Sequence, residues 1–354
     1  MQGQCLGESG ISCFHFHVDN KRIYSKIWMF SNAAARSYTE TCSIESSLDS
    51  SVAAPLDLIV KAVSAEIEDL WFFSQDGLKL HALRAGSQKE GRLPVICLPG
   101  ISRTAEDFRT LLSALAKNPD GARPAFALDS RGRGLSERDK NPANYSVPVE
   151  LGDLVAFLRA AKIQRAIFVG TSRGGILAMA LASIMPQAIA GCVLNDVGPV
   201  LDMQGLLRIK GYVGKMPKPR SWREAIASLK KIMAAHFPGF NGQDWENYAR
   251  RTWDERFEPR SDPALAAAFE GISAATPPPA LWPQFEALAA AGPLLVLRGE
   301  HSDLLSHETV AEMQRRDPRM QFAEISGQGH APALEREEVI RPILEFAARC
   351  DPAD

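Results

Sequence analysis

The stretch Arg165-Ala-Ile-Phe-Val-Gly-Thr-Ser-Arg-Gly-Gly-Ile-Leu177 changes character twice along its length. It is apolar and rich in β-branched residues as far as Val169, and it takes a helical pattern after Ser172. Gly170 and Gly174 stand two residues before and two residues after this serine. A serine on a sharp turn between a strand and a helix has a strained backbone, so its neighbours must lack bulk. The stretch therefore predicts a strand, a turn that exposes the Ser172 hydroxyl, and a helix.

The context of this turn resembles the nucleophile turn of the α/β-hydrolase family. Gly175 extends the run of small residues to the point where the helix must pack closely on the strand. Ile176 and Leu177 give the helix an apolar face. The resemblance runs from about residue 65 to the end of the chain, and it implies that Ser172 is a nucleophile. An ordinary glycine-rich turn without chemistry is the alternative.

The composition is that of a globular protein. Its 354 residues are 45% hydrophobic, which is enough to bury a full core. A formal net charge of -2 offers no broad positive field to nucleic acid or to an anionic membrane. The six cysteines are widely scattered, which favours reduced thiols. We expect a cytoplasmic monomer or homodimer that binds a small molecule, and no nucleic-acid or membrane partner.

Short apolar runs alternate with helical patterns from Leu70 onward. This alternation predicts an α/β fold, in which a mostly parallel sheet carries helices on both faces. The family resemblance implies eight strands. The expected elements are a hairpin around an Asp-Gly turn, buried strands at 93–98, 125–128, 191–194, 293–297 and 321–325 besides the strand before Ser172, and helices at 106–117, 149–161 and 334–348.

The alternation stops in the second half of the chain, where several helical segments follow one another. The family carries a helical cap at this point. Most aromatic side chains of this segment are expected to form its own small core, and Trp222 and Trp282 are candidate substrate contacts. Residues 1–64 include a serine-rich part and show no sustained hydrophobic periodicity. The expected division is a flexible extension at 1–64, a core at 65–199 and 289–354, and a helical cap at 200–288.

A serine nucleophile needs a base with a pKa near 7, and the base needs an acceptor that fixes its tautomer. In the family the order along the chain is serine, acid, histidine, each after a strand. Ser172, Asp303 and His330 appear in this order. His330 stands in a Gly-X-Gly-His sequence that resembles the family's histidine loop. We therefore expect His330 to be the base.

The acid has more than one candidate. Asp303 is expected, although it lies one residue further from Gly299 than the Gly-X-X-Asp spacing common in the family. Asp196 ends the strand after the nucleophile strand, where some members of the family place their acid. Glu300 is a third candidate.

The tetrahedral intermediate needs two amide donors directed at its oxyanion. The resemblance implies the backbone N–H groups of Arg173, after the nucleophile, and of Ile101, after Pro99-Gly100. The side chains of Arg103 and Arg173 lie beside this position in the expected fold and could bind a substrate carboxylate. The alternative is that both arginines point to solvent or to acidic neighbours.

The sequence shows no cluster with metal-ligand spacing and no dinucleotide fingerprint, so no metal and no cofactor are expected. The segment Asp129-Ser-Arg-Gly-Arg-Gly-Leu-Ser136 resembles a structural loop of the family. A phosphate-binding loop is the alternative, but the segment lacks the Gly-Lys-Ser/Thr ending of a nucleotide site.

These residues predict a cofactor-independent serine hydrolase that acts on small carboxylic esters or lactones through an acyl-enzyme. Hydrolysis of a carbon–carbon bond in a meta-cleavage-type dienoic acid is an alternative, because the same three side chains and a helical cap serve it. A non-catalytic ligand receptor on the same fold is the alternative from another functional class.

Overall fold

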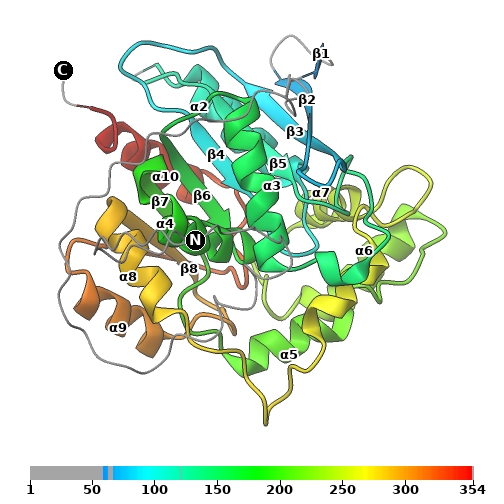
Figure 1. Cartoon of the computed structure of the whole chain (residues 1–354). Coiled ribbons are helices and arrows are strands. Elements are labelled where there is room, and N and C mark those ends of the chain that lie inside the picture. Colours follow the sequence, from blue (N-terminus) through cyan, green and yellow to red (C-terminus); the bar gives the residue numbers. More distant parts are fainter. Residues whose placement is uncertain (1–58, 63–66, 120, 353–354) are drawn as a thin grey trace, which may run out of the picture. The chain divides into compact units, whose positions relative to one another are not determined.

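A nine-stranded sheet forms the centre of the computed structural model, which describes residues 59–62, 67–119 and 121–352 (Figure 1). Its spatial order is β1-β2-β3-β5-β4-β6-β7-β8-β9. The pairs β1–β2, β2–β3 and β3–β5 are antiparallel, and the remaining pairs are parallel. The strands are β1 (Ile59–Ala62), β2 (Ile67–Phe73), β3 (Lys79–Ala85), β4 (Val95–Leu98), β5 (Ala125–Asp129), β6 (Ala166–Thr171), β7 (Ile189–Asn195), β8 (Leu294–Gly299) and β9 (Gln321–Ile325).

This sheet confirms the predicted fold class, with one strand more than the eight expected. The additional edge strand β1 falls within the segment 1–64 that we assigned to a flexible extension, and it pairs with β2. The rest of that predicted extension lies outside the described residues. Every residue of β4, β5 and β7 is buried, because strands inside a parallel sheet are covered on both faces.

Helices cover both faces of the sheet (Figure 1). One face packs against α3 (Val147–Ala160), α4 (Arg173–Ile184), α8 (Trp282–Ala291) and α9 (His307–Arg316). The other face packs against α2 (Arg109–Lys117) and α10 (Glu337–Arg349). Short 3-10 helices are η1 (Ala105–Phe108), η2 (Pro142–Asn144) and η3 (Pro186–Ala188). No helix among the described residues is long and apolar enough to cross a lipid bilayer.

Residues 203–269, which we call the helical insertion, lie between β7 and α8. They form α5 (Met203–Tyr212), α6 (Trp222–Met233), α7 (Gly242–Thr252) and the 3-10 helix η4 (Pro263–Phe269), in the part of the chain where several helical segments in succession were expected. An apolar cluster around Trp245 and Trp253 belongs to the insertion itself. The predicted cap ran to residue 288, and in the structure Phe285 and Leu288 of α8 belong to the core cluster on one face of the sheet.

The loop after β5 has the structural role that its sequence resemblance implied. The Asp129 carboxylate accepts hydrogen bonds from the backbone N–H groups of Ala105 at 2.7 Å and of Leu135 at 3.0 Å. A Cβ atom on Gly134 would lie 2.1 Å from this carboxylate, so the turn requires glycine there. The loop after β4 and the loop after β5 are thereby held together.

Candidate active site

Ser172 lies on the predicted turn between β6 and α4. Its backbone has φ 51° and ψ -115°, a strained conformation for a residue other than glycine. A Cβ atom on Gly170 would lie 2.5 Å from the backbone nitrogen of Gly175, and a Cβ atom on Gly174 would lie 2.0 Å from the carbonyl oxygen of Leu98. The close approach of helix to strand therefore requires the glycines that the sequence places there.

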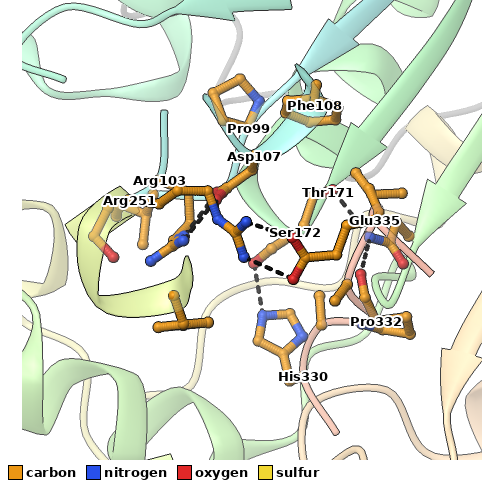
Figure 2. Close-up of a pocket in the computed structure, with 18 of the residues that line it drawn as sticks. Pro99, Arg103, Asp107, Phe108, Thr171, Ser172, Arg251, His330, Pro332 and Glu335 are labelled. Atoms are coloured by element: carbon orange, nitrogen blue, oxygen red, sulfur yellow. Dashed lines mark hydrogen bonds and ion pairs between the residues drawn. The ribbon is translucent and has the colours of Figure 1, made fainter. Parts of the chain in front are cut away.

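The Ser172 hydroxyl contacts the imidazole of His330 (Figure 2). Its Oγ lies 2.9 Å from Nε2, and the other ring nitrogen, Nδ1, lies 2.8 Å from Oδ2 of Asp196. The Asp196 carboxylate is fully buried. A carboxylate only accepts hydrogen bonds, so the Nδ1–H of His330 donates to Asp196 and leaves Nε2 free to accept from Ser172.

Two further donors hold Asp196 in place. The backbone N–H of Gly299 donates to Oδ1 at 2.8 Å, and the hydroxyl of Ser302 donates to Oδ2 at 2.6 Å. The neighbouring Asn195 also fixes the histidine loop, since its side-chain amide donates to the carbonyl of Pro332 at 3.1 Å. Asn195 and Ser302 were not expected in the site, because their partners lie on loops far away along the chain.

The structure contradicts the prediction that Asp303 orients His330. Arg208, on α5 of the insertion, donates to both carboxylate oxygens of Asp303 at 2.5 and 2.7 Å. Burial opposes ionisation of Asp303, but the hydrogen bonds and charge of Arg208 outweigh burial and lower the pKa of the carboxyl group. The loop after β8 turns Ser302 toward Asp196 and Asp303 toward the insertion.

Glu300, the third candidate acid, also lies away from the imidazole. Its carboxylate accepts hydrogen bonds from the hydroxyl of Ser326 at 2.8 Å and from the backbone N–H of Gly327 at 2.7 Å. The candidate that meets His330 is therefore Asp196, the alternative noted at the end of β7.

The two residues expected to form an oxyanion hole flank Ser172. Arg173 is the first residue of α4, where a backbone N–H has no acceptor within the helix. Ile101 lines the cavities beside Ser172. A hole formed by these two N–H groups stays a prediction, and their neighbourhood is consistent with it.

A buried carboxylate joins the segments that carry these two residues. Glu150, on α3, accepts hydrogen bonds from Arg133 at 2.6 Å and from Nε of Arg173 at 2.9 Å. Arg133 in turn donates to the carbonyl oxygen of Ile101 at 2.7 Å. Burial opposes ionisation of Glu150, but the two arginines outweigh it and lower the pKa of the carboxyl group. Glu150 was not expected in the site, because it occupies an ordinary position in a helical pattern.

A polar cavity of about 80 Å³ opens beside Ser172 (Figure 2). Arg103 donates to both carboxylate oxygens of Asp107 at 2.7 and 2.6 Å. Arg251, on α7, donates to both oxygens of Glu335 at 2.5 and 3.0 Å, and its Nε lies 3.0 Å from Asp107. Arg103 therefore lines the cavity, but it is paired with an acidic neighbour, which is the alternative that the sequence left open.

A second cavity, of about 210 Å³, lies on another side of Ser172. Apart from Ser172 and Arg173, every residue that lines it is apolar. The Arg173 guanidinium is bonded to Glu150, so this cavity is apolar over most of its wall. The insertion and the segment after it contribute much of this wall, including Leu206, Ile209, Ala268, Phe269 and Ile272.

Comparison with known proteins gives the family. Residues 95–342 match the family model described as the alpha/beta hydrolase family, and this match spans more than half of the chain. The chain belongs to the alpha/beta hydrolase family. Several of its relatives are named as hydrolases or esterases.

Three relatives illustrate the similarity of this hydrolase to known proteins. A 3-hydroxybutyrate-oligomer hydrolase of Cupriavidus necator is 34% identical over 252 residues, which are 68% of this chain and 83% of the relative. An esterase of Mycobacterium tuberculosis is 27% identical over 75% of this chain and 86% of its own length. The crystal structure of an alpha/beta hydrolase from Novosphingobium aromaticivorans is 39% identical, covers 81% of this chain and 99% of its own, and has a TM-score of 0.74.

The two tryptophans predicted as substrate contacts line neither of the hydrolase cavities beside Ser172, within the part of the chain that is described. Trp222 packs edge-on against Phe257 at a ring distance of 5.0 Å. Trp282 packs against Phe285 at 5.9 Å and lies on the core cluster. Both pack against neighbouring aromatic rings, and their role as substrate contacts stays a prediction.

Proposed function

We propose that this protein is a serine esterase that hydrolyses small carboxylic esters or lactones, with Ser172 as nucleophile, His330 as general base and Asp196 as the acid that orients His330. The observation that carries this proposal is the continuous contact from Ser172 Oγ through the imidazole to the buried carboxylate. A neutral imidazole held at 2.9 Å from a hydroxyl by an acceptor on its far side is the arrangement that activates serine.

The reaction follows from this geometry in two halves. Ser172 Oγ attacks the carbonyl carbon while its proton passes to Nε2 of His330, and the tetrahedral intermediate then expels the alcohol, which takes that proton from Nε2. Water next attacks the acyl-enzyme and gives a proton to Nε2. The second intermediate expels Ser172 Oγ, which recovers the proton, and the carboxylic acid leaves.

The N–H groups of Ile101 and Arg173 would receive the negative charge of both intermediates. One such donor is worth a factor of about 10² to 10³ in kcat. The contacts of Arg133 with the Ile101 carbonyl and of Glu150 with Arg173 support this role, because they fix the segments that carry the donors.

Short oligoesters of hydroxy acids are the first natural substrates to test, because a relative 34% identical to this chain is named for 3-hydroxybutyrate oligomers. A free carboxylate on the substrate would have to share Arg103 or Arg251 with Asp107 or Glu335. The ratio of kcat/KM for a hydroxybutyrate dimer and for its methyl ester measures whether an anionic substrate is preferred. Carbon–carbon hydrolysis, the receptor role, the cytoplasmic location and the oligomeric state stay predictions.

The test of the proposed function is a p-nitrophenyl acetate assay with a fluorophosphonate label. We expect a burst of p-nitrophenol followed by turnover, and labelling that Ser172→Ala abolishes. Ser183→Ala, on the same helix α4 but outside the cavities beside Ser172, is the matched control and should behave as the wild type. A wild-type protein that is inert to both reagents and binds small ligands tightly would overturn the proposal in favour of a receptor.

A further inference from the structure

The two cavities beside Ser172 differ in one residue that matters for the chemistry. Ser172 and Ile101 line both of them. His330 lines the polar cavity and does not line the apolar one. The site is thus divided into two sides, and the catalytic base stands on only one of them.

The position of the base decides which part of an ester each cavity receives. After the attack, the proton taken from Ser172 resides on Nε2 of His330 and must reach the oxygen of the departing alcohol. That oxygen has to lie within hydrogen-bond reach of Nε2, so the alcohol extends into the cavity lined by His330. The acyl group is attached to the same carbonyl carbon on the other side, where the apolar cavity begins.

We propose that the apolar cavity binds the acyl chain and the polar cavity binds the alcohol, so that esters of an apolar acyl group with a polar alcohol are preferred over the hydroxybutyrate oligomers considered above. This inference rests on the proposed esterase function and adds the orientation and chemical class of the substrate.

The dimensions and charges of the cavities agree with this class. A cavity of about 150 Å³ holds a benzene molecule, so the apolar cavity of about 210 Å³ has room for a larger hydrocarbon group. In the polar cavity the positive charges of Arg103 and Arg251 are matched by Asp107 and Glu335. This side presents two paired charges and the Ser102 hydroxyl among apolar residues such as Phe108 and Phe240, so it can receive an alcohol that carries both a hydroxyl group and a short hydrocarbon part.

Ala268 is the residue through which the acyl cavity can be narrowed. It lies on η4, is half-buried and lines the apolar cavity. The adjacent Ala267 is also half-buried on η4 but lies outside the cavity lining. Ala268→Phe should therefore fill the cavity, and Ala267→Phe is a control of equal size in the same short helix.

The experiment measures kcat/KM for two series of esters, one with acyl groups from acetyl to decanoyl on a constant alcohol, and one with a constant acyl group on alcohols of increasing polarity. For the wild type we expect kcat/KM to rise about fourfold per added methylene of the acyl chain until the cavity is full. Ala268→Phe should lower the octanoyl value at least tenfold more than the acetyl value, and leave the ranking of alcohols unchanged. Ala267→Phe should keep the wild-type profile.

A second readout does not depend on turnover. Ser172 is inactivated with p-nitrophenyl alkylphosphonates whose alkyl chain, from methyl to octyl, stands for the acyl chain. Ala268→Phe should slow inactivation by the long chains only. If both readouts show the same chain-length profile in Ala268→Phe and in the wild type, or if Ala268→Phe alters the ranking of alcohols instead, the inferred orientation is wrong and the esterase function stands. If Ser172 is labelled but no ester is hydrolysed, the proposed function fails, and the phosphonate series still decides the orientation.

Discussion

Oδ2 of Asp196 lies 2.8 Å from Nδ1 of His330, although 134 residues separate the two along the chain. The contact joins the end of β7 to the loop after β9. The preceding residue, Asn195, holds the same loop by a hydrogen bond to the Pro332 carbonyl. Two adjacent residues at the end of one strand therefore set the position of the imidazole.

Asp196→Asn should nearly abolish turnover. An asparagine amide at this position favours the wrong tautomer of His330, and the equivalent change in another serine hydrolase lowers kcat by about 10⁴. Asp303→Asn should retain kcat within a few-fold and should lower the Tm, because it weakens the bidentate pair with Arg208. The measurements are kcat for p-nitrophenyl acetate and thermal unfolding. Full activity of Asp196→Asn combined with an inactive Asp303→Asn would restore the assignment of Asp303 as the acid.

Ser302→Ala should reduce kcat while KM changes little. The substitution removes a donor that holds Asp196 at 2.6 Å, and a hydrogen bond to a charged group contributes about 1.5–3 kcal/mol. A loss of about tenfold in kcat is expected if roughly half of this energy is needed to keep the Asp196 carboxylate oriented toward His330. Ser306→Ala is the control, since Ser306 caps α9 on the same loop: it should lower stability by about 1 kcal/mol without changing kcat. Equal kcat values for the two variants would contradict a positioning role for Ser302.

Glu150→Gln should lower kcat more than it raises KM. The buried Glu150 holds Arg133 and Arg173, and breaking a buried pair costs about 3–5 kcal/mol of stability because it leaves unpaired charge. Both segments expected to form the oxyanion hole would loosen. The control is Glu106→Gln, which breaks a half-exposed pair with Arg109 worth only about 0–1 kcal/mol. A Glu150→Gln enzyme that folds and keeps wild-type kcat would show that the network serves stability alone.

Gly174→Ala should unfold the protein or destabilise it by about 4 kcal/mol or more, because the new Cβ would lie 2.0 Å from a backbone oxygen of β4 that cannot move. Gly152→Ala, in α3, is the opposite case, because a Cβ atom there meets nothing within 4 Å. This substitution should raise the free energy of unfolding by about 0.5–1 kcal/mol. The free energy of unfolding in urea measures both changes. Similar effects at the two positions would contradict the close packing of α4 on the sheet.

His81 should make stability depend on pH above 6.5. Its imidazole is buried between Asp129, at 2.7 Å, and Asp69, at 3.1 Å. Burial opposes the positive charge of the His81 imidazole, but the two carboxylates outweigh burial and raise the pKa of the imidazole above 6.5. The folded state therefore binds the imidazole proton more tightly than the unfolded state does. The stabilisation that results is complete below pH 6.5 and is lost as the pH rises through the folded-state pKa of His81. We expect His81→Gln to cost more unfolding free energy at pH 6 than at pH 9, and a constant cost would refute this.

The sequence predicted the parts of the site that local sterics determine. Gly170, Ser172 and Gly174 specify a strained turn by themselves, and the apolar runs around them specify buried parallel strands. His330 was found because its loop has a recognisable pattern after the last strand. These features need no knowledge of how distant segments meet.

The acid could not be chosen by such arguments, because two carboxylates end neighbouring strands. Their contacts differ in the fold: Arg208, 95 residues before Asp303, holds Asp303 against the insertion, whereas Asp196 contacts His330. The cavity walls likewise depend on how the insertion packs, and Trp222 and Trp282 lie against other aromatic rings that their sequence positions did not indicate. An aromatic residue in a sequence predicts a buried side chain, but it does not predict whether that side chain packs against substrate or against protein.

The bond between Arg251 and Glu335 has a consequence for protein engineering. The arginine belongs to α7 of the insertion, and the glutamate lies five positions beyond His330 on the loop that carries the base. A chimaera that receives its insertion from another hydrolase would leave one of these charges without its counterpart, right beside the imidazole. Positions 251 and 335 must therefore be transplanted together if a new substrate range is to be gained without slowing the enzyme.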